Sequence, residues 1–90
     1  MPKEIQEVKI NNPQGVHLRV AANVVEMCKE SQSRVSLSCK NCRHADACSV
    51  LSVLMLGAAQ GDSVTITAEG EDAKEIVGKL TDYFNDGGGI

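Results

Sequence analysis

The spacing of hydrophobic and polar positions changes several times along the chain, and each change predicts a new element. Three stretches alternate apolar and polar residues, as strands with one buried face do: residues 4–10, 35–39 and 64–68. Three others repeat apolar residues at helical spacing: from Leu18 to about Ser31–Ser33, 50–56, and from Ala73 to Phe84. A tight connection around 40–43 followed by 44–47 predicts a short partner strand. The predicted order is β-α-β-β-α-β-α.

This order predicts an α+β fold in which three helices cover one face of a mainly antiparallel, four-stranded sheet. The alternation within the strands is typical of a sheet whose other face meets water. The first helix is expected to bury a stripe made of Leu18, Ala21, Ala22, Val25 and Cys28. The last helix carries acidic residues in its first turns, which suits the positive end of the helix dipole.

Length and composition then narrow the class of protein. Ninety residues make one domain, expected to span 1–86 and to be followed by a flexible, glycine-rich end at 87–90. Aromatic residues are nearly absent, and the net charge is −3, so we expect no nucleic-acid binding. The most apolar stretch, 50–59, is about half a membrane span, so no membrane insertion is expected. The charge is uneven: residues 1–60 are net +2 and residues 61–90 net −5.

Four cysteines raise the question of compartment and of metal binding. The N-terminus lacks the apolar run of a signal peptide, so we expect a cytoplasmic protein with reduced thiols. Cys39, Cys42, His44 and Cys48 have the ligand types of a zinc site, but their spacing fits none of the common zinc patterns. Two alternatives stay open: a redox-sensitive Cys39–Cys42 pair, or ordinary packing with Cys39 and Cys48 buried and Cys42 exposed. Cys28 is expected in the core.

His17 and Arg19 stand where a loop becomes the first helix. The free backbone N–H groups of a first helical turn make a ready anion site, and an arginine two residues on adds a fixed cation. An imidazole beside such donors is suited to accepting and holding a phosphoryl group. The plainer alternative is that His17 caps the helix and Arg19 is a solvated charge.

The helix at 50–56 is apolar almost all the way round, and Ser49 is a good N-cap for it. A domain with one sheet buries only one side of such a helix. The rest predicts an exposed apolar patch, which on a small protein usually marks an interface. The alternative is that the following loop covers it.

Taken together, these segments resemble the HPr family, the histidine-containing phosphocarriers of the bacterial phosphotransferase system. The resemblance rests on three motifs: Gly15-x-His17-x-Arg19, then Ser49-Val50-Leu51-x-Val53-Leu54-x-Leu56, and Gly61-x-x-Val64-Thr65-Ile66-x-Ala68-x-Gly70. It implies an open-faced β-sandwich and a monomeric carrier without a cofactor, which is not a turnover enzyme. It also implies that His17 takes a phosphoryl group on Nδ1 from enzyme I and passes it to an enzyme IIA component.

The resemblance also assigns supporting roles. Arg19 would steady the phosphate, Ser49 falls where some members carry a regulatory phosphoserine, and Val50, Leu51 and Leu54 are the candidates for partner docking. The family motif usually reads His-Ala-Arg-Pro, whereas Leu18 and Val20 stand here. The segment Ala45–Leu56 and the ending Tyr83-Phe84-Asn85 look closer to the nitrogen-branch type, NPr, than to the sugar-branch one. The rival hypothesis is an HPr-like regulatory module, or a metal or redox sensor built on the cysteines.

Overall fold

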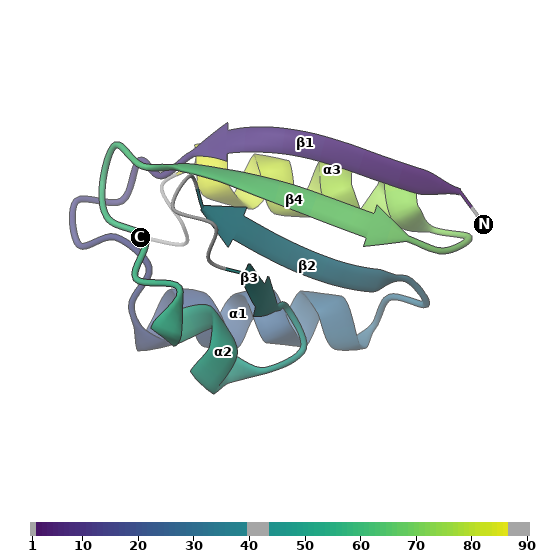
Figure 1. The fold of residues 1–90 in the computed structure, drawn as a ribbon, viewed down its shortest axis with the longest axis horizontal. Helices are drawn as coiled ribbons and strands as arrows, with labels where there is room; N and C mark the ends of the chain where they lie inside the picture. Colours follow the sequence, from purple (N-terminus) through teal and green to yellow (C-terminus); the bar gives the residue numbers. More distant parts are fainter. Residues whose placement is uncertain (1, 40–43, 87–90) are drawn as a thin grey trace.

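The computed structural model describes residues 2–39 and 44–86 (Figure 1). Its elements follow the chain in the order β1 (Lys3–Lys9), α1 (Leu18–Lys29), β2 (Arg34–Cys39), β3 (His44–Asp46), α2 (Val50–Met55), β4 (Ser63–Glu69) and α3 (Ala73–Asn85). The predicted order β-α-β-β-α-β-α is confirmed. The glycine-rich end predicted at 87–90 and the connection at 40–43 lie outside the described residues.

The four strands form one antiparallel sheet in the order β1-β4-β2-β3. β4 therefore lies in the interior of the sheet, where it pairs with β1 from Lys3 opposite Glu69 to Lys9 opposite Ser63. Its Val64, Ile66 and Ala68 are buried, while the hydroxyl residues between them are only half-buried. The predicted α+β fold, a four-stranded antiparallel sheet with three helices, is confirmed.

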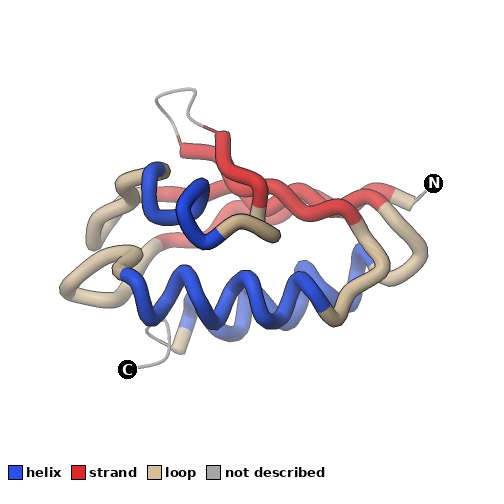
Figure 2. Tube along the Cα trace, turned by 90° about the horizontal axis from the view of Figure 1, so that it is seen from below, coloured by secondary structure: helices blue, strands red, loops and turns tan. Residues whose placement is uncertain are grey.

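The helices and the sheet enclose a single hydrophobic core. α1 and α3 form a layer against the sheet, and α2 lies beside the N-terminal half of α1 and next to β3 (Figures 1 and 2). Fully buried side chains come from all three helices and from the interior strands, among them Val24, Leu37, Val53, Ile66 and Leu80. Burying each such side chain contributes roughly 1.5–3 kcal/mol relative to leaving it in water.

The buried stripe of α1 differs from the predicted one. Ala21, Val25 and Cys28 are buried as expected, but Leu18 is 63% exposed and Ala22 is also exposed. Val20 and Val24 are buried in their place. The predicted stripe was wrong at two positions. The first two turns of α1 carry apolar residues at adjacent positions, so periodicity alone does not show which face of the helix is buried.

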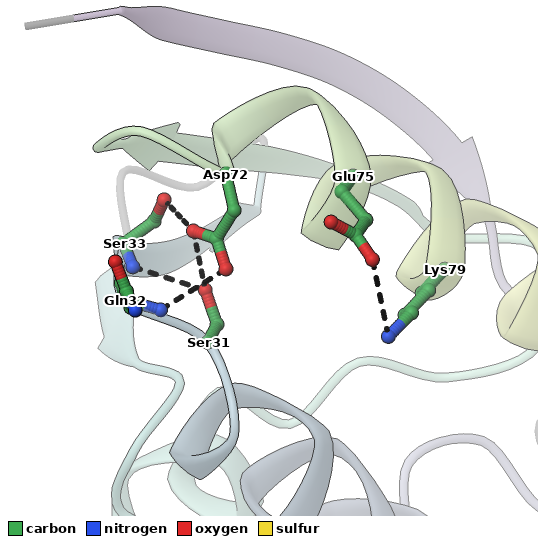
Figure 3. A network of polar contacts seen from close by, with 6 residues as sticks. All are labelled: Ser31, Gln32, Ser33, Asp72, Glu75 and Lys79. Atoms are coloured by element: carbon green, nitrogen blue, oxygen red, sulfur yellow. Dashed lines mark hydrogen bonds and ion pairs between the residues drawn. The ribbon is translucent and has the colours of Figure 1, made fainter.

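α1 ends at Lys29, before the predicted end at Ser31–Ser33, because the polar side chains that follow bond elsewhere. Ser31 Oγ donates to Asp72 Oδ1 at 3.0 Å, the Gln32 backbone N–H donates to Asp72 Oδ2 at 3.0 Å, and the Ser33 hydroxyl also donates to Asp72 (Figure 3). These bonds hold the pKa of the Asp72 carboxyl below its ordinary value of 3.8. The bond from Ser33 has the largest effect, and the bond from the Gln32 backbone the next largest. Asp72 thereby ties the α1–β2 connection to the start of α3.

Candidate functional site

His17 is the residue at which α1 begins. Its backbone is extended, with φ −106° and ψ −179°, and its carbonyl oxygen accepts the Ala21 N–H at 2.9 Å. Its side chain makes no hydrogen bond to the helix N-terminus. His17 therefore stands at the N-cap position, as the capping alternative had it, but its half-buried imidazole makes no capping hydrogen bond.

The loop before His17 is held by hydrogen bonds at both of its ends. At one end, the Ile10 N–H donates to the Asp62 carbonyl and the Ile10 carbonyl accepts the Gly61 N–H, each at 2.9 Å. At the other end, the Val16 N–H donates to the Ala58 carbonyl at 2.9 Å. Gly15 takes φ +69°, and a Cβ there would lie 2.6 Å from the Ala58 oxygen. This close approach requires glycine, and it fixes the backbone from which the imidazole projects.

Asn12 lies under the imidazole and is only 3% exposed. Its Nδ2 lies 3.2 Å from His17 Nε2, and its Oδ1 accepts the Gln14 N–H at 2.9 Å. The Asn12 carbonyl also accepts the Gly15 N–H at 2.9 Å. Sequence reasoning missed this residue, since an asparagine before proline in a loop is ordinary turn chemistry and nothing local reveals its burial.

Arg19 is exposed in the first turn of α1, two residues after His17. That turn contains no acidic residue. A cation near the positive end of a helix dipole does not stabilise the helix, but it adds to the attraction of the free N–H groups for an anion. The start of α1 therefore carries an exposed cation and no acidic residue in its first turn, and the anion site stays a prediction.

Three large apolar side chains are exposed on α2 and at the start of α1: Leu18 at 63%, Leu51 at 67% and Met55 at 70%. We call these three residues the apolar patch. Of the residues expected to dock a partner, Leu51 belongs to it, whereas Val50 and Leu54 are half-buried and pack against the core. Met55 was missed although it follows Leu51 by one helical turn, and Leu18 was missed because it was assigned to the core.

Ser49 is the N-cap of α2, as predicted. Its backbone is extended, and its Oγ accepts the Ser52 N–H at 3.2 Å. Such a cap contributes roughly 1 kcal/mol to a helix. The helix that carries the apolar patch thus depends on a hydroxyl oxygen that is half-buried.

The cysteines separate into different environments. Cys28 is 1% exposed. The pKa of its thiol is raised to about 12, chiefly by burial and to a smaller extent by the nearby Cys48 and Asp46. Cys48 is exposed, so its expected burial was wrong, while Cys39 is half-buried against the core as predicted. Cys42 lies outside the described residues. Within 2–39 and 44–86, no group of three or more His, Cys, Asp or Glu side chains is placed to hold a metal ion.

None of the helices in the described part of the chain is long and apolar enough to cross a membrane.

Comparison with known proteins gives a consistent result. The family model described as the PTS HPr component phosphorylation site matches residues 5–86. The chain is 37% identical to a phosphocarrier protein HPr of Buchnera aphidicola over 75 residues, which is 83% of this chain and 87% of that protein. It is 33% identical to a phosphocarrier protein NPr of Proteus mirabilis over 84 residues, 93% of each. A crystal structure of HPr from Thermoanaerobacter tengcongensis superposes with a TM-score of 0.89 at 29% identity, covering 97% of both chains.

Proposed function

The chain belongs to the HPr family of phosphocarriers of the phosphotransferase system, and from this premise we propose that His17 is its phosphorylated residue. It accepts a phosphoryl group from phosphorylated enzyme I, for which phosphoenolpyruvate is the ultimate donor, and passes it to an enzyme IIA component. The protein acts as a carrier and not as an enzyme that turns over substrate by itself. We place it in the cytoplasm, as a monomer.

The contact between Asn12 and His17 is the observation that supports this proposal best. Asn12 contacts Nε2 of the ring. Nδ1 is therefore the ring nitrogen that does not face Asn12, and the helix start at His17 carries an exposed Arg19 and no acidic residue. The arrangement favours a negatively charged group on that side of the imidazole.

The transfer itself needs little from this chain beyond position. In the tautomer whose proton is on Nε2, the Nδ1 lone pair attacks the phosphorus in line, the bond from phosphorus to the donor breaks, and the donor leaves with its electron pair. The proton on Nε2 then passes to solvent, which leaves a neutral phosphorylated ring. Arg19 and the first N–H groups of α1 would steady the phosphoryl oxygens. Return of the group to an acceptor reverses these steps.

The apolar patch supports docking to a protein partner. Leu18 and the two α2 residues, Leu51 and Met55, are exposed near the imidazole-bearing end of α1. An exposed cluster of large apolar side chains on a small domain usually marks an interface. The partners proposed for this surface are enzyme I and an enzyme IIA component, which would meet it in turn.

The departures from the usual family motif bear on this surface more than on the transfer. Val20, at the usual proline position, is 1% exposed and packs in the core, while Leu18, at the usual alanine position, enlarges the apolar patch. A phosphate on Ser49 would add charge at the start of α2, beside the same patch, and would hinder docking. The resemblance to NPr in particular stays a prediction.

The proposal is tested by incubating the protein with enzyme I, magnesium and phosphoenolpyruvate and measuring the intact mass. We expect one added phosphate that is labile in acid and stable in base. His17→Ala is expected to remove it, while His44→Ala, which changes the other, exposed histidine, is expected to keep it. Absence of the phosphate with a cognate enzyme I, or its survival in His17→Ala, would refute the proposal.

A further inference from the structure

We propose that Asn12 is a positioning residue for His17: its amide N–H bonds to Nε2, holds the imidazole in place and stabilises the ring once a phosphoryl group is attached to Nδ1. The inference rests on the proposed phosphorylation of His17. It assigns a role to a residue that belongs to none of the three sequence motifs and lies five positions before the histidine.

The orientation of the Asn12 amide follows from its neighbours. The Gln14 backbone N–H is a donor and lies 2.9 Å from one end of the amide, so that end must be the oxygen. The other end is then the NH₂ group, which lies 3.2 Å from His17 Nε2. Because Asn12 is 3% exposed, water has little access to replace either bond. Nε2 therefore faces a donor and is expected to present its lone pair.

Nε2 has a free lone pair in only some protonation and phosphorylation states of the imidazole. In a neutral ring the proton is then on Nδ1, and in a neutral ring phosphorylated on Nδ1 the phosphorus takes the place of that proton. The Asn12 bond is thus satisfied in both the resting and the phosphorylated state. It is broken in the state that attacks, because that ring carries its proton on Nε2, which would meet the amide donor.

This preference has a consequence for the lifetime of the phosphorylated protein. Loss of the phosphoryl group to water or to an acceptor is helped by protonation of Nε2, because a neutral imidazole then leaves in place of an imidazolate. The Asn12 donor opposes that protonation. Asn12 therefore slows unproductive hydrolysis: water attacks phosphorus, the P–N bond breaks, and inorganic phosphate is released.

The first test uses the protein without phosphate, so that it is independent of the proposed function. Nitrogen-15 NMR of the His17 ring, at a pH where the ring is neutral, shows which nitrogen carries the proton. We expect Nδ1–H in the wild type and Nε2–H in Asn12→Asp, whose carboxylate still accepts the Gln14 N–H and now also accepts from Nε2. Asn11→Asp makes the same change at the neighbouring exposed position and is expected to leave the wild-type pattern.

The second test measures the phosphorylated ring. Phosphoramidate, a small donor that phosphorylates imidazoles without an enzyme, is expected to modify Nδ1 of His17 in the wild type. We expect the Asn12→Asp phosphohistidine to hydrolyse about tenfold faster, the change that a differential hydrogen-bond strength of about 1.4 kcal/mol produces. Asn11→Asp is expected to hydrolyse at the wild-type rate.

The outcomes separate the two proposals. A wild-type ring found mainly as Nε2–H, or equal hydrolysis rates in the wild type and Asn12→Asp, would overturn the role of Asn12. The wild-type spectrum decides this even if the variant fails to fold. Failure of enzyme I to phosphorylate His17, with the predicted tautomers observed, would instead overturn the proposed function and leave the Asn12–His17 bond established.

Discussion

Gly15 lets the loop before His17 come into contact with the α2–β4 connection. Its φ of +69° is strained for any residue with a side chain, and an added Cβ would lie 2.6 Å from the Ala58 oxygen and 2.9 Å from Ala59 Cα. We expect Gly15→Ala to lower the free energy of unfolding by about 2 kcal/mol or more, because the left-handed conformation alone costs about 1–2 kcal/mol. Urea denaturation measures the change.

Gly61→Ala is the matched control for this substitution. Gly61 has φ +90°, but a Cβ there would meet no atom within 4 Å, so only the backbone conformation is penalised. Gly15→Ala is therefore expected to be the more destabilising of the two. Equal losses would show that the approach to Ala58 relaxes without cost.

Asp72 predicts a dependence of stability on acid. Its pKa in the folded protein is lowered, chiefly by the hydrogen bond from Ser33, so its contribution is present above the ordinary value of 3.8 and is lost as the pH falls through the lowered value. We expect Asp72→Asn to lower the melting temperature at neutral pH, with the difference from wild type shrinking below about pH 4. Thermal unfolding followed by circular dichroism across pH checks this.

Asp82→Asn serves as the control for Asp72→Asn, since it removes the same charge from an exposed position of α3. Its melting temperature is expected to stay close to that of the wild type. A gap between wild type and Asp72→Asn that persists unchanged in acid would mean that the ionised carboxylate is not the source of the effect.

For individual residues, the sequence was informative where a role depends only on residue type and on neighbours in the chain. His17 and Arg19 were proposed as site residues from residue type and position, because a loop-to-helix junction places both near free backbone N–H groups. Asn12 was not proposed, because no local pattern in the sequence indicates that it is buried. Cys48 was misassigned for a similar reason: whether a cysteine is covered depends on elements that its neighbours in sequence do not specify.

Helix α2 is the element on which the docking proposal depends. Leu51→Glu replaces one residue of the apolar patch with a charge at a position where the side chain is 67% exposed and contributes little to the core. We expect the fold to be kept and the affinity for enzyme I to fall about tenfold or more, as for a residue at the centre of an interface. Calorimetry with enzyme I, or the Michaelis constant for the carrier, measures the loss.

Ile5→Glu provides the control for the docking test. Ile5 is 58% exposed and lies opposite Thr67 on the face of the sheet away from the core, so the same chemical change is made far from the patch. Its affinity for enzyme I is expected to equal that of the wild type. Equal loss in both variants would place the effect in overall charge and not in the apolar patch.

Among the elements, their order and approximate bounds were predictable, but the orientation of α1 was not. Alternation marks β4 clearly, since its buried and half-buried residues follow the period of two. In α1, apolar residues occupy adjacent positions such as Val20, Ala21 and Ala22, so more than one stripe is consistent with the sequence. The choice depends on what packs against the helix. That is also why Leu18 became part of a surface and not of the core.

For the molecule as a whole, Cys28 predicts that one thiol reports on complete unfolding. It is 1% exposed in the shared core, and the pKa of its thiol is about 12, so only about one molecule in ten thousand has this thiolate at pH 8. We expect an alkylating reagent to label exposed Cys48 promptly and Cys28 only as the protein unfolds. Peptide mapping by mass spectrometry distinguishes the two sites, and prompt labelling of Cys28 in native protein would contradict the prediction.

The fold class was predictable from the residues because strand and helix periods alternate along the chain. The order of the strands in the sheet is a different matter. Local patterns show that β4 is a strand, but not that it lies between β1 and β2. Pairing depends on long-range packing, so the strand order was not predicted from the sequence.

The position of β4 in the sheet bears on how the protein is made. β4, which lies between β1 and β2 in the sheet, is synthesised after the five elements that precede it in the chain. A nascent chain that stops before β4 holds β1 and the β2–β3 hairpin without the strand that pairs with both. Pairing strands that are far apart in sequence costs loop-closure entropy before the contacts between them form and stabilise the sheet. The sheet is therefore completed only after β4 has been synthesised and has paired with both β1 and β2.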